Sequence, residues 1–351
     1  IDDQGNVYIA SVSQSSDFPT NNAAQNTYGG GNSDGVSFKL NADFSQLLWS
    51  TYLGGNADDA LYSIQKDSLN NVYVTGGSLS DDFPVTNDAI QKQRKGNIDA
   101  VITKIDKSGK QFLHSTYLGT DEYDQAYFVQ LDHDDDVYIL GQSKGDMPIL
   151  PNNTIYHQKN AGLFVTKFSN DLSNIIYSTT LGDTISTDEI VPNISPTAFL
   201  VNECENIFIA GWGGETNEDY NGGFTINLPV TTNAFQKTTD GSDFYLMAIQ
   251  KDLNQLLYAT YFGGPLTADN VDGGTSRFDE KGIVYQSVCA GCLFGNNDFP
   301  IYPPLDNDPN TYPMPNKSEN CNNGVIKFDL ALLEADFKIK AICDNKVEIE
   351  N

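Results

Sequence analysis

The sequence predicts an all-β protein, a β-propeller made of four-stranded antiparallel blades. Three observations predict this fold class. A set of short motifs returns along the whole chain of 351 residues. The stretches between motifs are short alternating or aromatic runs bounded by Gly, Asn, Asp or Pro, and helical spacing is not sustained anywhere. Repeats of this length indicate an array or ring of small units, and four short strands per unit are typical of a propeller blade.

Three motifs mark the repeat. Ser-Thr-Tyr-Leu-Gly at residues 50–54 returns, with substitutions, at residues 115–119, 178–182 and 259–263. Asn-Val-Tyr at residues 71–73 returns at residues 6–8, 136–138, 206–208 and 283–285. Asp-Phe-Pro at residues 82–84 returns at residues 17–19, 146–148, 227–229 and 298–300. We therefore expect blades over residues 1–331, in five units of about 1–62, 63–128, 129–194, 195–270 and 271–331.

Each complete unit is expected to hold four strands, A to D. In the second unit they are expected at residues 62–66, 71–76, 100–106 and 111–118. The first unit lacks most of strand A and the fifth lacks strand D, so we expect missing sequence upstream of Ile1 to complete the ring. Two further alternating runs carry no repeat motif, so residues 332–351 are expected to be the truncated start of a separate β-sandwich.

Two of the connections within a unit have a constant length. The aromatic residue of strand B follows the polar residue that ends strand A by six positions, as Tyr73 follows Asp67. The strand D threonine follows a fixed position near the end of strand C by twelve positions, as Thr116 follows Lys104. The B–C and D–A connections vary in length, and in an up-and-down blade they share one face. Variable loops on one face often carry binding sites, but long loops also vary without function, and both interpretations stay open.

The variable loops of the fourth and fifth units carry several aromatic residues. Such side chains stack on sugars or anchor protein interfaces, so we expect a glycan or a surface protein to bind there. The candidate ligand-binding residues are Trp212, Tyr220, Phe224, Tyr302 and Tyr312. Trp212 lies among glycines, and for this residue packing against its own loop is the favoured alternative.

The chain is strongly acidic. Lys and Arg total 20 against 47 Asp and Glu, which gives a formal charge of −27. This charge argues against nucleic acid and anionic membranes as partners. No apolar run reaches the roughly 18 residues that a membrane span needs, so the chain is not expected to span a membrane.

Five cysteines favour an oxidising compartment over the cytosol. Cys289 and Cys292 follow strand B of the fifth unit, and Cys321 precedes its strand C. A disulfide from Cys321 to one of the other two is favoured over a zinc site, because no fourth ligand lies nearby in sequence. Cys204 lies in a turn on the opposite face and is not expected to reach them. Cys343 is expected to pair with a cysteine beyond Asn351.

Motifs of known catalytic sites are missing from the sequence. The three histidines fall in different structural places, and no nucleophile elbow, zinc-protease motif or phosphate-binding loop is present. We therefore predict no catalytic residue and no cofactor. Asp132, Asp134 and Asp136 alternate as in a calcium-binding loop, but the central glycine and closing glutamate are missing. An Asx turn is favoured for this segment, and Ca²⁺ is the alternative.

The recurring motifs resemble the SBBP type of bacterial β-propeller repeat. The last two units, with Gly211-Trp-Gly-Gly214 and Val288-Cys-Ala-Gly-Cys292, look like the closing units of large Bacteroidetes surface proteins. In those proteins PKD-type sandwiches and a gliding-motility-associated region read by the type IX secretion system follow the propeller. The resemblance implies secretion to the outside or outer surface of the cell, a PKD-type domain at residues 332–351, and the secretion machinery as a partner. It brings no enzymatic activity.

These observations together predict a non-enzymatic, extracellular modular protein whose propeller is a platform for binding or adhesion, with a link to gliding motility. Two alternatives stay open. The first is a purely structural module, or a secretion cargo, without a specific ligand. The second is a propeller enzyme that acts on polysaccharides.

Overall fold

The computed structural model describes residues 1–151, 155–185, 189–214, 223–271, 276–292, 298–302, 322–330, 339–343 and 346–349, the last two ranges and residues 291, 292 and 322 as backbone only. The chain divides into two compact units. The first consists of Ile1–Asn153, Gly162–Leu181 and Asp188–Ile190, and the second of Thr154–Ala161, Gly182–Thr187 and Val191–Asn351.

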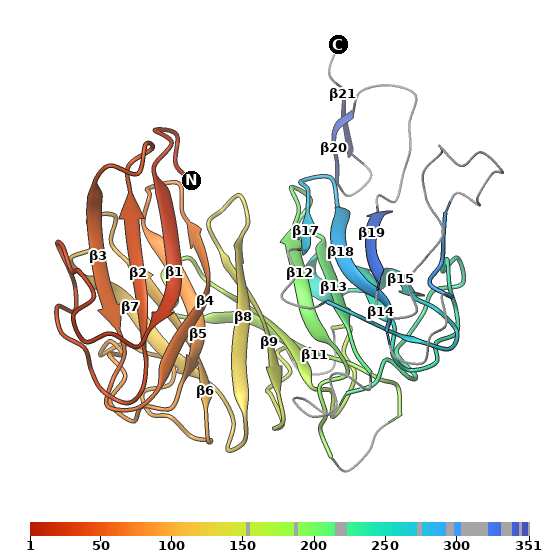
Figure 1. The fold of residues 1–351 in the computed structure, drawn as a ribbon, viewed down its shortest axis with the longest axis horizontal. Helices are drawn as coiled ribbons and strands as arrows, with labels where there is room; N and C mark the ends of the chain where they lie inside the picture. Colours follow the sequence, from red (N-terminus) through yellow and green to blue (C-terminus); the bar gives the residue numbers. More distant parts are fainter. Residues whose placement is uncertain are drawn as a thin grey trace. The chain divides into compact units, whose positions relative to one another are not determined.

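Within these residues the strands form five antiparallel sheets and a hairpin (Figure 1). Sheet 1 contains β1 (Val7–Ser13), β2 (Asp34–Leu40) and β3 (Leu47–Leu53). Sheet 2 contains β4 (Asp59–Lys66), β5 (Val72–Ser78), β6 (Asp99–Ile105) and β7 (Phe112–Leu118). Sheet 3 contains β8 (Asp124–Leu131), β9 (Val137–Ser143), β10 (Leu163–Phe168) and β11 (Ile175–Leu181). These three sheets belong to the first compact unit.

The second compact unit holds the remaining strands. Sheet 4 contains β12 (Ser195–Val201), β13 (Ile207–Trp212), β14 (Phe244–Ile249) and β15 (Leu256–Phe262). Sheet 5 contains β16 (Ala268–Asn270), β17 (Ser276–Phe278), β18 (Ile283–Cys292) and β19 (Asn322–Asp329), and both β16 and β17 pair with β18. The hairpin joins β20 (Ile339–Cys343) to β21 (Lys346–Ile349). The predicted all-β fold with four-stranded antiparallel blades is confirmed.

The Ser-Thr-Tyr-Leu-Gly motif recurs because its members hold the B–C loop along the outer edge of strand D. Thr116 Oγ1 accepts a hydrogen bond from the backbone N–H of Gln91 at 2.9 Å, and the N–H of Gly119 donates to Gln91 Oε1 at 3.0 Å. The same pair of bonds joins strand D to Gln25 in sheet 1 and to Gln236 in sheet 4. We call this arrangement the glutamine strap. It covers backbone groups that an edge strand would leave open.

The tyrosine of the same motif explains why Asp-Phe-Pro recurs with it. Tyr117 O–H donates to the carbonyl of Ser80 at 2.7 Å and accepts from the N–H of Phe83 at 3.1 Å. The Phe83 ring is buried, 5.8 Å from the Tyr117 ring. Tyr52 holds Ser15 and Phe18 in the same way. The two motifs are therefore the two sides of one contact.

The constant six-residue spacing has an electrostatic cause. Asp132 Oδ1 accepts the N–H groups of Asp134 and Asp136, both at 3.0 Å, which is an Asx turn. Asp132 Oδ2 lies 2.8 Å from Lys167 Nζ, and this ammonium lies 4.9 Å from the centre of the Tyr138 ring. The same Asp–Tyr–Lys triad recurs in the other two sheets of the first compact unit, as Asp2, Tyr8 and Lys39 and as Asp67, Tyr73 and Lys104.

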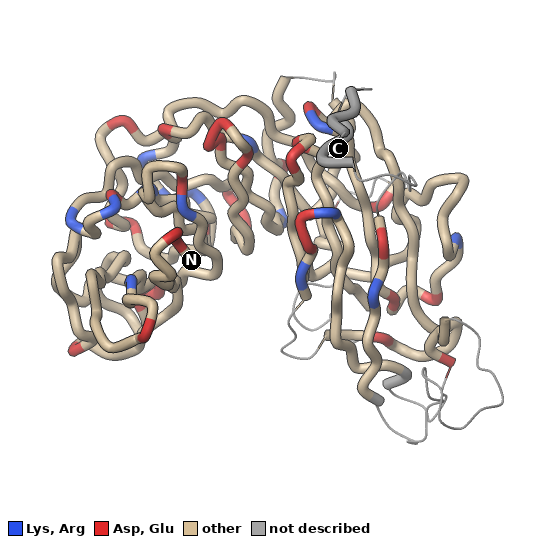
Figure 2. Tube along the Cα trace, turned by 90° about the horizontal axis from the view of Figure 1, so that it is seen from above, with Lys and Arg blue, Asp and Glu red and all other residues tan. Residues whose placement is uncertain are grey.

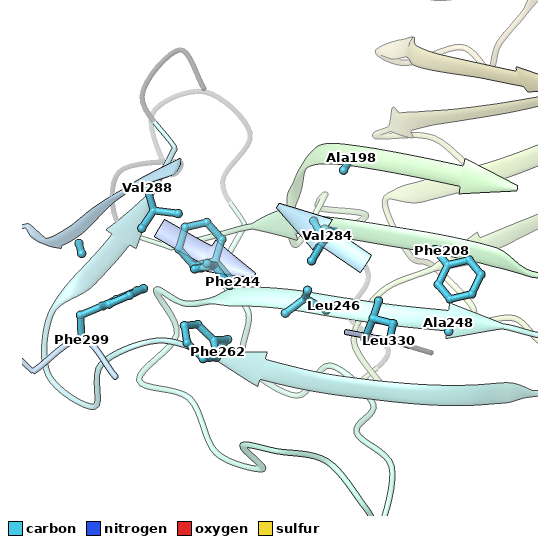
Figure 3. Close-up of a cluster of buried hydrophobic side chains, with 13 residues drawn as sticks. Ala198, Phe208, Phe244, Leu246, Ala248, Phe262, Val284, Val288, Phe299 and Leu330 are labelled. Atoms are coloured by element: carbon cyan, nitrogen blue, oxygen red, sulfur yellow. The ribbon is translucent and has the colours of Figure 1, made fainter. Parts of the chain in front are cut away.

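Hydrophobic side chains fill the space between successive sheets within each compact unit. One cluster lies between sheets 1 and 2, and a second lies between sheets 2 and 3. A third joins sheets 4 and 5, where Phe244 and Phe262 lie close to Val288 and Phe299 (Figure 3). Face-to-face packing of antiparallel sheets places the core between blades, as in a propeller.

The triad yields a prediction about stability. Because Lys167 and Asp132 are both buried, the single variant Lys167→Ala leaves an uncompensated charge and should lower the free energy of unfolding by about 3 kcal/mol. In sheet 4 the three equivalent positions are Asn202, Phe208 and Ala248. The triple variant D132N/Y138F/K167A copies that set and should recover part of the loss in urea denaturation, since Asp136, the second partner of Lys167 at 3.5 Å, is left without its lysine. A triple variant as unstable as the single one would show that the triad is more than a replaceable charge pair, and Lys92→Ala on the surface is the control.

Candidate binding face

The variable face of each sheet is formed by its B–C and D–A connections, and buried carboxyl groups gather there. Asp34 begins β2, and its Oδ2 accepts the N–H of Gly29 at 2.6 Å. Asp59 begins β4, and its Oδ2 accepts the N–H of Gly55 at 2.7 Å. Gly54 lies between these two carboxyl groups, since a side-chain carbon placed there would lie 2.5 Å from Asp34 Oδ1 and 2.9 Å from Asp59 Oδ2. Only glycine fits this position.

The same arrangement is present at two other D–A connections. At the connection that contains Gly119, an added side-chain carbon would lie 2.8 Å from Asp99 Oδ2, and Asp124, whose carboxyl interacts with that of Asp99, accepts the N–H of Thr120 at 2.6 Å. Asp243 and Asp269 flank Gly263, where Asp269 Oδ2 accepts the N–H of Gly264 at 2.8 Å. We call these three sites the carboxyl junctions, with the pairs Asp34/Asp59, Asp99/Asp124 and Asp243/Asp269.

Burial dominates the electrostatics of these junctions. It raises the pKa of Asp34 to about 6, and the negative charges of Asp59 and Asp82 act in the same direction. Burial also raises the pKa of Asp243 to about 8, reinforced by neighbouring aspartates. The pKa values of Asp59 and Asp124 are raised for the same primary reason.

The aspartate of the Asp-Phe-Pro motif ties its loop to the preceding D–A connection. Asp82 Oδ1 accepts the N–H of Asn56 at 2.7 Å, and Asp298 Oδ2 accepts the N–H of Leu266 at 2.7 Å. These bonds use backbone groups that would otherwise face solvent. The carboxylates are therefore engaged in holding loops.

Two exposed aromatic rings lie on the variable face of the second compact unit. Phe235 is 52% exposed and Tyr302 is 73% exposed, and their ring centres lie 6.1 Å apart in a T-shaped arrangement. Phe235 also contacts the rings of Phe262 and Phe328, at 5.8 and 5.9 Å. The aromatic pair Phe235–Tyr302 is therefore supported from below by the packed core and open to solvent above.

The predicted ligand-binding residues occupy different environments. Tyr302 is exposed, as described above. Trp212 ends β13, is half-buried, and packs against the hydrophobic cluster between sheets 4 and 5. Phe224 is half-buried, and its carbonyl accepts a hydrogen bond from Asn193 Nδ2 at 3.1 Å. Tyr220 and Tyr312 lie outside the described residues.

Phe235 was not among the sequence candidates, although a signal for it exists. It directly precedes Gln236, the glutamine of the strap, as Ile90 precedes Gln91. Because the glutamine side chain turns inward to strand D, the residue before it turns outward. Ile90 is accordingly 39% exposed.

The cysteines differ from the expectation in one respect. Cys204 is disulfide-bonded, and the sequence analysis had given this residue no partner within the chain. Cys289 is half-buried on β18, Cys292 ends that strand, and Cys321 lies outside the described residues, so the predicted disulfide among these three stays a prediction. The sequence position of Cys204, in a tight A–B turn, gave no hint of a bond partner.

Among the residues that the structure describes, no group of three or more His, Cys, Asp or Glu side chains is arranged to bind a metal ion. At the calcium candidates, the Lys167 ammonium lies 2.8 Å from Asp132 and 3.5 Å from Asp136. Lys167 thus forms ion pairs with two of the three aspartates, where a calcium ion would otherwise be needed. The backbone N–H of Asp134 donates to Asp132 Oδ1 within the turn.

Acidic residues are distributed over both compact units, with fewer basic ones among them (Figure 2). The described residues contain no helix of the length and apolarity needed to cross a bilayer.

A comparison with protein families matches residues 48–84. This stretch is an SBBP beta-propeller repeat. In the structure the SBBP repeat begins in β3, continues through β4 and β5, and ends at the Asp-Phe-Pro turn. It therefore contains the carboxyl Asp59, the motif tyrosine Tyr52 and the turn aspartate Asp67.

Among solved structures, a protein of unknown function from Bacteroides caccae is similar at 8% identity, with a TM-score of 0.35 over 74% of this chain and 68% of that one. A PL25 ulvan lyase is similar at 10% identity, with a TM-score of 0.43 over 84% of this chain and 64% of that one. The WD40 domain of Toxoplasma gondii coronin is similar at 9% identity, with a TM-score of 0.32 over 84% of this chain and 71% of that one. Similarity at this level assigns no activity to the chain. No curated protein matches the sequence.

The two candidate aromatic residues Trp212 and Tyr302 should respond differently to truncation. Trp212→Ala removes packing from the cluster between sheets 4 and 5 and should lower the free energy of unfolding by about 2 to 3 kcal/mol. Tyr302→Ala removes an exposed ring and should change it by no more than about 0.5 kcal/mol. Urea denaturation of both variants measures the difference. Equal effects would contradict the distinction between a packing residue and a surface residue.

Proposed function

We propose that this protein is a non-enzymatic binding platform outside the cell, and that its ligand docks on the aromatic pair Phe235–Tyr302. The propeller fold itself is suited to a binding or structural role. The observation that carries the proposal is the exposure of two contacting rings on a rigid base, because ordered aromatic surfaces give binding area at a low entropic cost.

An uncharged glycan is the partner that this surface fits best. Aromatic rings stack on the apolar faces of sugars, and the strongly acidic composition repels anionic polymers. Ile226 and Leu266 are further exposed apolar residues in the loops of the second compact unit. A surface protein with an apolar patch shares this chemistry and is an outcome of the test below.

The non-enzymatic part of the proposal is supported by how the acidic groups are used. The candidate acids of the variable face are buried beside glycines or accept backbone N–H groups, as Asp59 and Asp82 do. A general acid or base has to reach a substrate proton within hydrogen-bonding distance. Carboxyl groups that are buried or bonded to loop backbone in this way stabilise the fold and do not face a substrate.

Secretion and a position on the cell surface are also proposals. The disulfide of Cys204 supports an oxidising compartment, and the high acidic charge suits a soluble extracellular module. The PKD-type domain at residues 332–351, the link to gliding motility, adhesion and the type IX machinery as a partner rest on the resemblance described at the outset.

A glycan array with the purified chain tests the proposal. The double variant F235A/Y302A should lose binding at least tenfold, about 1.4 kcal/mol, because both rings of the docking surface are removed. Thermal unfolding of the variant checks that it is folded.

Phe44→Ala is the matched control, since Phe44 is a 63% exposed phenyl ring in the C–D turn of sheet 1, in the first compact unit. This variant should bind as the wild type does. Full binding by the double variant would refute the docking site. Wild-type protein that binds neither a glycan nor a surface protein would indicate a purely structural module.

A further inference from the structure

The carboxyl junctions bury more acid than the surrounding structure can neutralise. Their six carboxyl-bearing residues are between 0 and 2% exposed. Each pair contains at least one oxygen that is buried and has no hydrogen-bond partner, and these oxygens are Asp34 Oδ1, Asp59 Oδ1, Asp124 Oδ1 and Asp243 Oδ1. A buried ionised carboxylate with an unpartnered oxygen is costly and tends to take up a proton instead.

The groups that face these carboxyls supply no positive charge. Around Asp34 they are the N–H groups of Gly29 and Gly30, the carboxyls of Asp59 and Asp82, and the neutral phenols of Tyr28 and Tyr52. Around Asp59 they are the N–H of Gly55, the hydroxyls of Ser78 and Ser80, the latter 2.8 Å away, and the carboxyl of Asp82.

The other junctions are similar. Gln236 Nε2 donates to Asp243 Oδ2 at 3.2 Å, and the charged neighbours of Asp243 are the carboxyls of Asp240, Asp269 and Asp298. At the remaining pair, Gln91 Nε2 and two backbone N–H groups bind Asp99, whereas Thr120, the Ser143 hydroxyl and the carboxyl of Asp99 face Asp124. The Lys and Arg ion pairs that the structure describes involve other carboxylates.

A fourth D–A connection provides a comparison within the same chain. Here Asn193 Oδ1 accepts the N–H of Asp183 at 3.0 Å, in the place where Asp59 accepts the N–H of Gly55. The residue five positions before the strand C lysine is Asp34 or Asp99 in other units but Gly162 in this one. Both acids are thus replaced together by neutral residues. The loop bond needs only an acceptor oxygen, so the charge of the acid pairs is not required for folding.

We infer that each carboxyl junction binds one proton as the pH falls toward 5, on the oxygen that lacks a hydrogen-bond partner, and that the fold is more stable in this protonated form. The chain would then carry a set of buried acid sensors between its sheets. The proton removes one negative charge from each pair and converts an unpartnered acceptor into a hydroxyl.

A proton fits these sites better than a metal ion. Calcium takes six to eight oxygen ligands, whereas no group of three or more acidic or metal-binding side chains is assembled in the described residues. A glycine also lies between the two carboxyls of a pair at Gly54 and Gly263, where an added side-chain carbon would come within 3 Å of both. That space is already filled.

The direction of the pH effect follows from linkage. An aspartate has a pKa near 3.8 when unfolded, and in the folded chain the pKa is about 6 for Asp34 and about 8 for Asp243. Between these values the folded state holds protons that the unfolded state has released, so stability falls as the pH rises from about 4 to about 8. The salt-bridged Asp2, whose pKa is lowered, acts in the opposite direction and at more acidic pH.

The test compares urea unfolding of the full chain at about pH 5.5 and about pH 8.5 for wild type and three variants. Wild type should be more stable at the lower pH. Asp59→Asn and Asp269→Asn copy the natural Asn193, keep the acceptor oxygen, and should each gain stability at the higher pH and lose part of the pH dependence. Asp121→Asn changes the net charge equally at an exposed position of a D–A loop, and its pH dependence should match that of wild type.

Infrared difference spectroscopy of the folded wild type provides a second readout that does not depend on the variants folding. A protonated-carboxyl band should grow as the pH falls from about 8 to about 5 and should be weaker in Asp269→Asn. Unchanged pH dependence in both asparagine variants, or no such band, would overturn the inference. So would a gain in stability with added Ca²⁺ at the higher pH that Asp269→Asn abolishes, because the pair would then be a cation site.

Discussion

The hydrogen bonds that strand D makes with the B–C loop of its own sheet are the interaction on which the blades depend. Thr116 and Gly119 hold Gln91 along the strand edge, and Tyr117 holds the Asp-Phe-Pro turn that leads into the loop. The threonine, tyrosine and glycine of the motif therefore each have a partner more than twenty residues away in sequence. Once the loop is fixed in this way, the position at which strand C begins along strand D is also fixed. The glycine that ends the motif then lies against the carboxyl groups of the carboxyl junction.

Much of this fold can be predicted from the sequence because its repeated motifs are local. In the second unit the expected strands agree with β4 to β7 within about three residues. The start of β4 lies earlier than expected because Asp59 and Ala60, which look like loop residues, already pair with Ser78 and Gly77. The constant six-residue spacing predicted a fixed turn, although only the structure shows the lysine and the tyrosine ring that hold its aspartate.

The candidate functional residues were harder to predict because their environments depend on contacts between distant segments. Tyr302 was anticipated as an exposed aromatic residue, but its partner Phe235 was not, since a single aromatic among polar residues gives no sign of what supports it. The buried acids were hidden for a related reason. In a chain with 47 acidic residues, no composition argument distinguishes Asp34, which is buried, from Asp43, which is exposed. Cys204 belongs to the same class, because pairing of cysteines is a property of the fold.

The glutamine strap has a consequence for how similar units can be joined in one polypeptide. Neighbouring repeats with nearly the same sequence risk exchanging strands during synthesis, since a strand of one unit fits the sheet of the next. A loop that closes over strand D of its own sheet blocks the acceptor edge as soon as that sheet has formed. Each blade can then fold as a separate cooperative unit. Further repeats can be added by duplication without strand exchange between neighbouring blades.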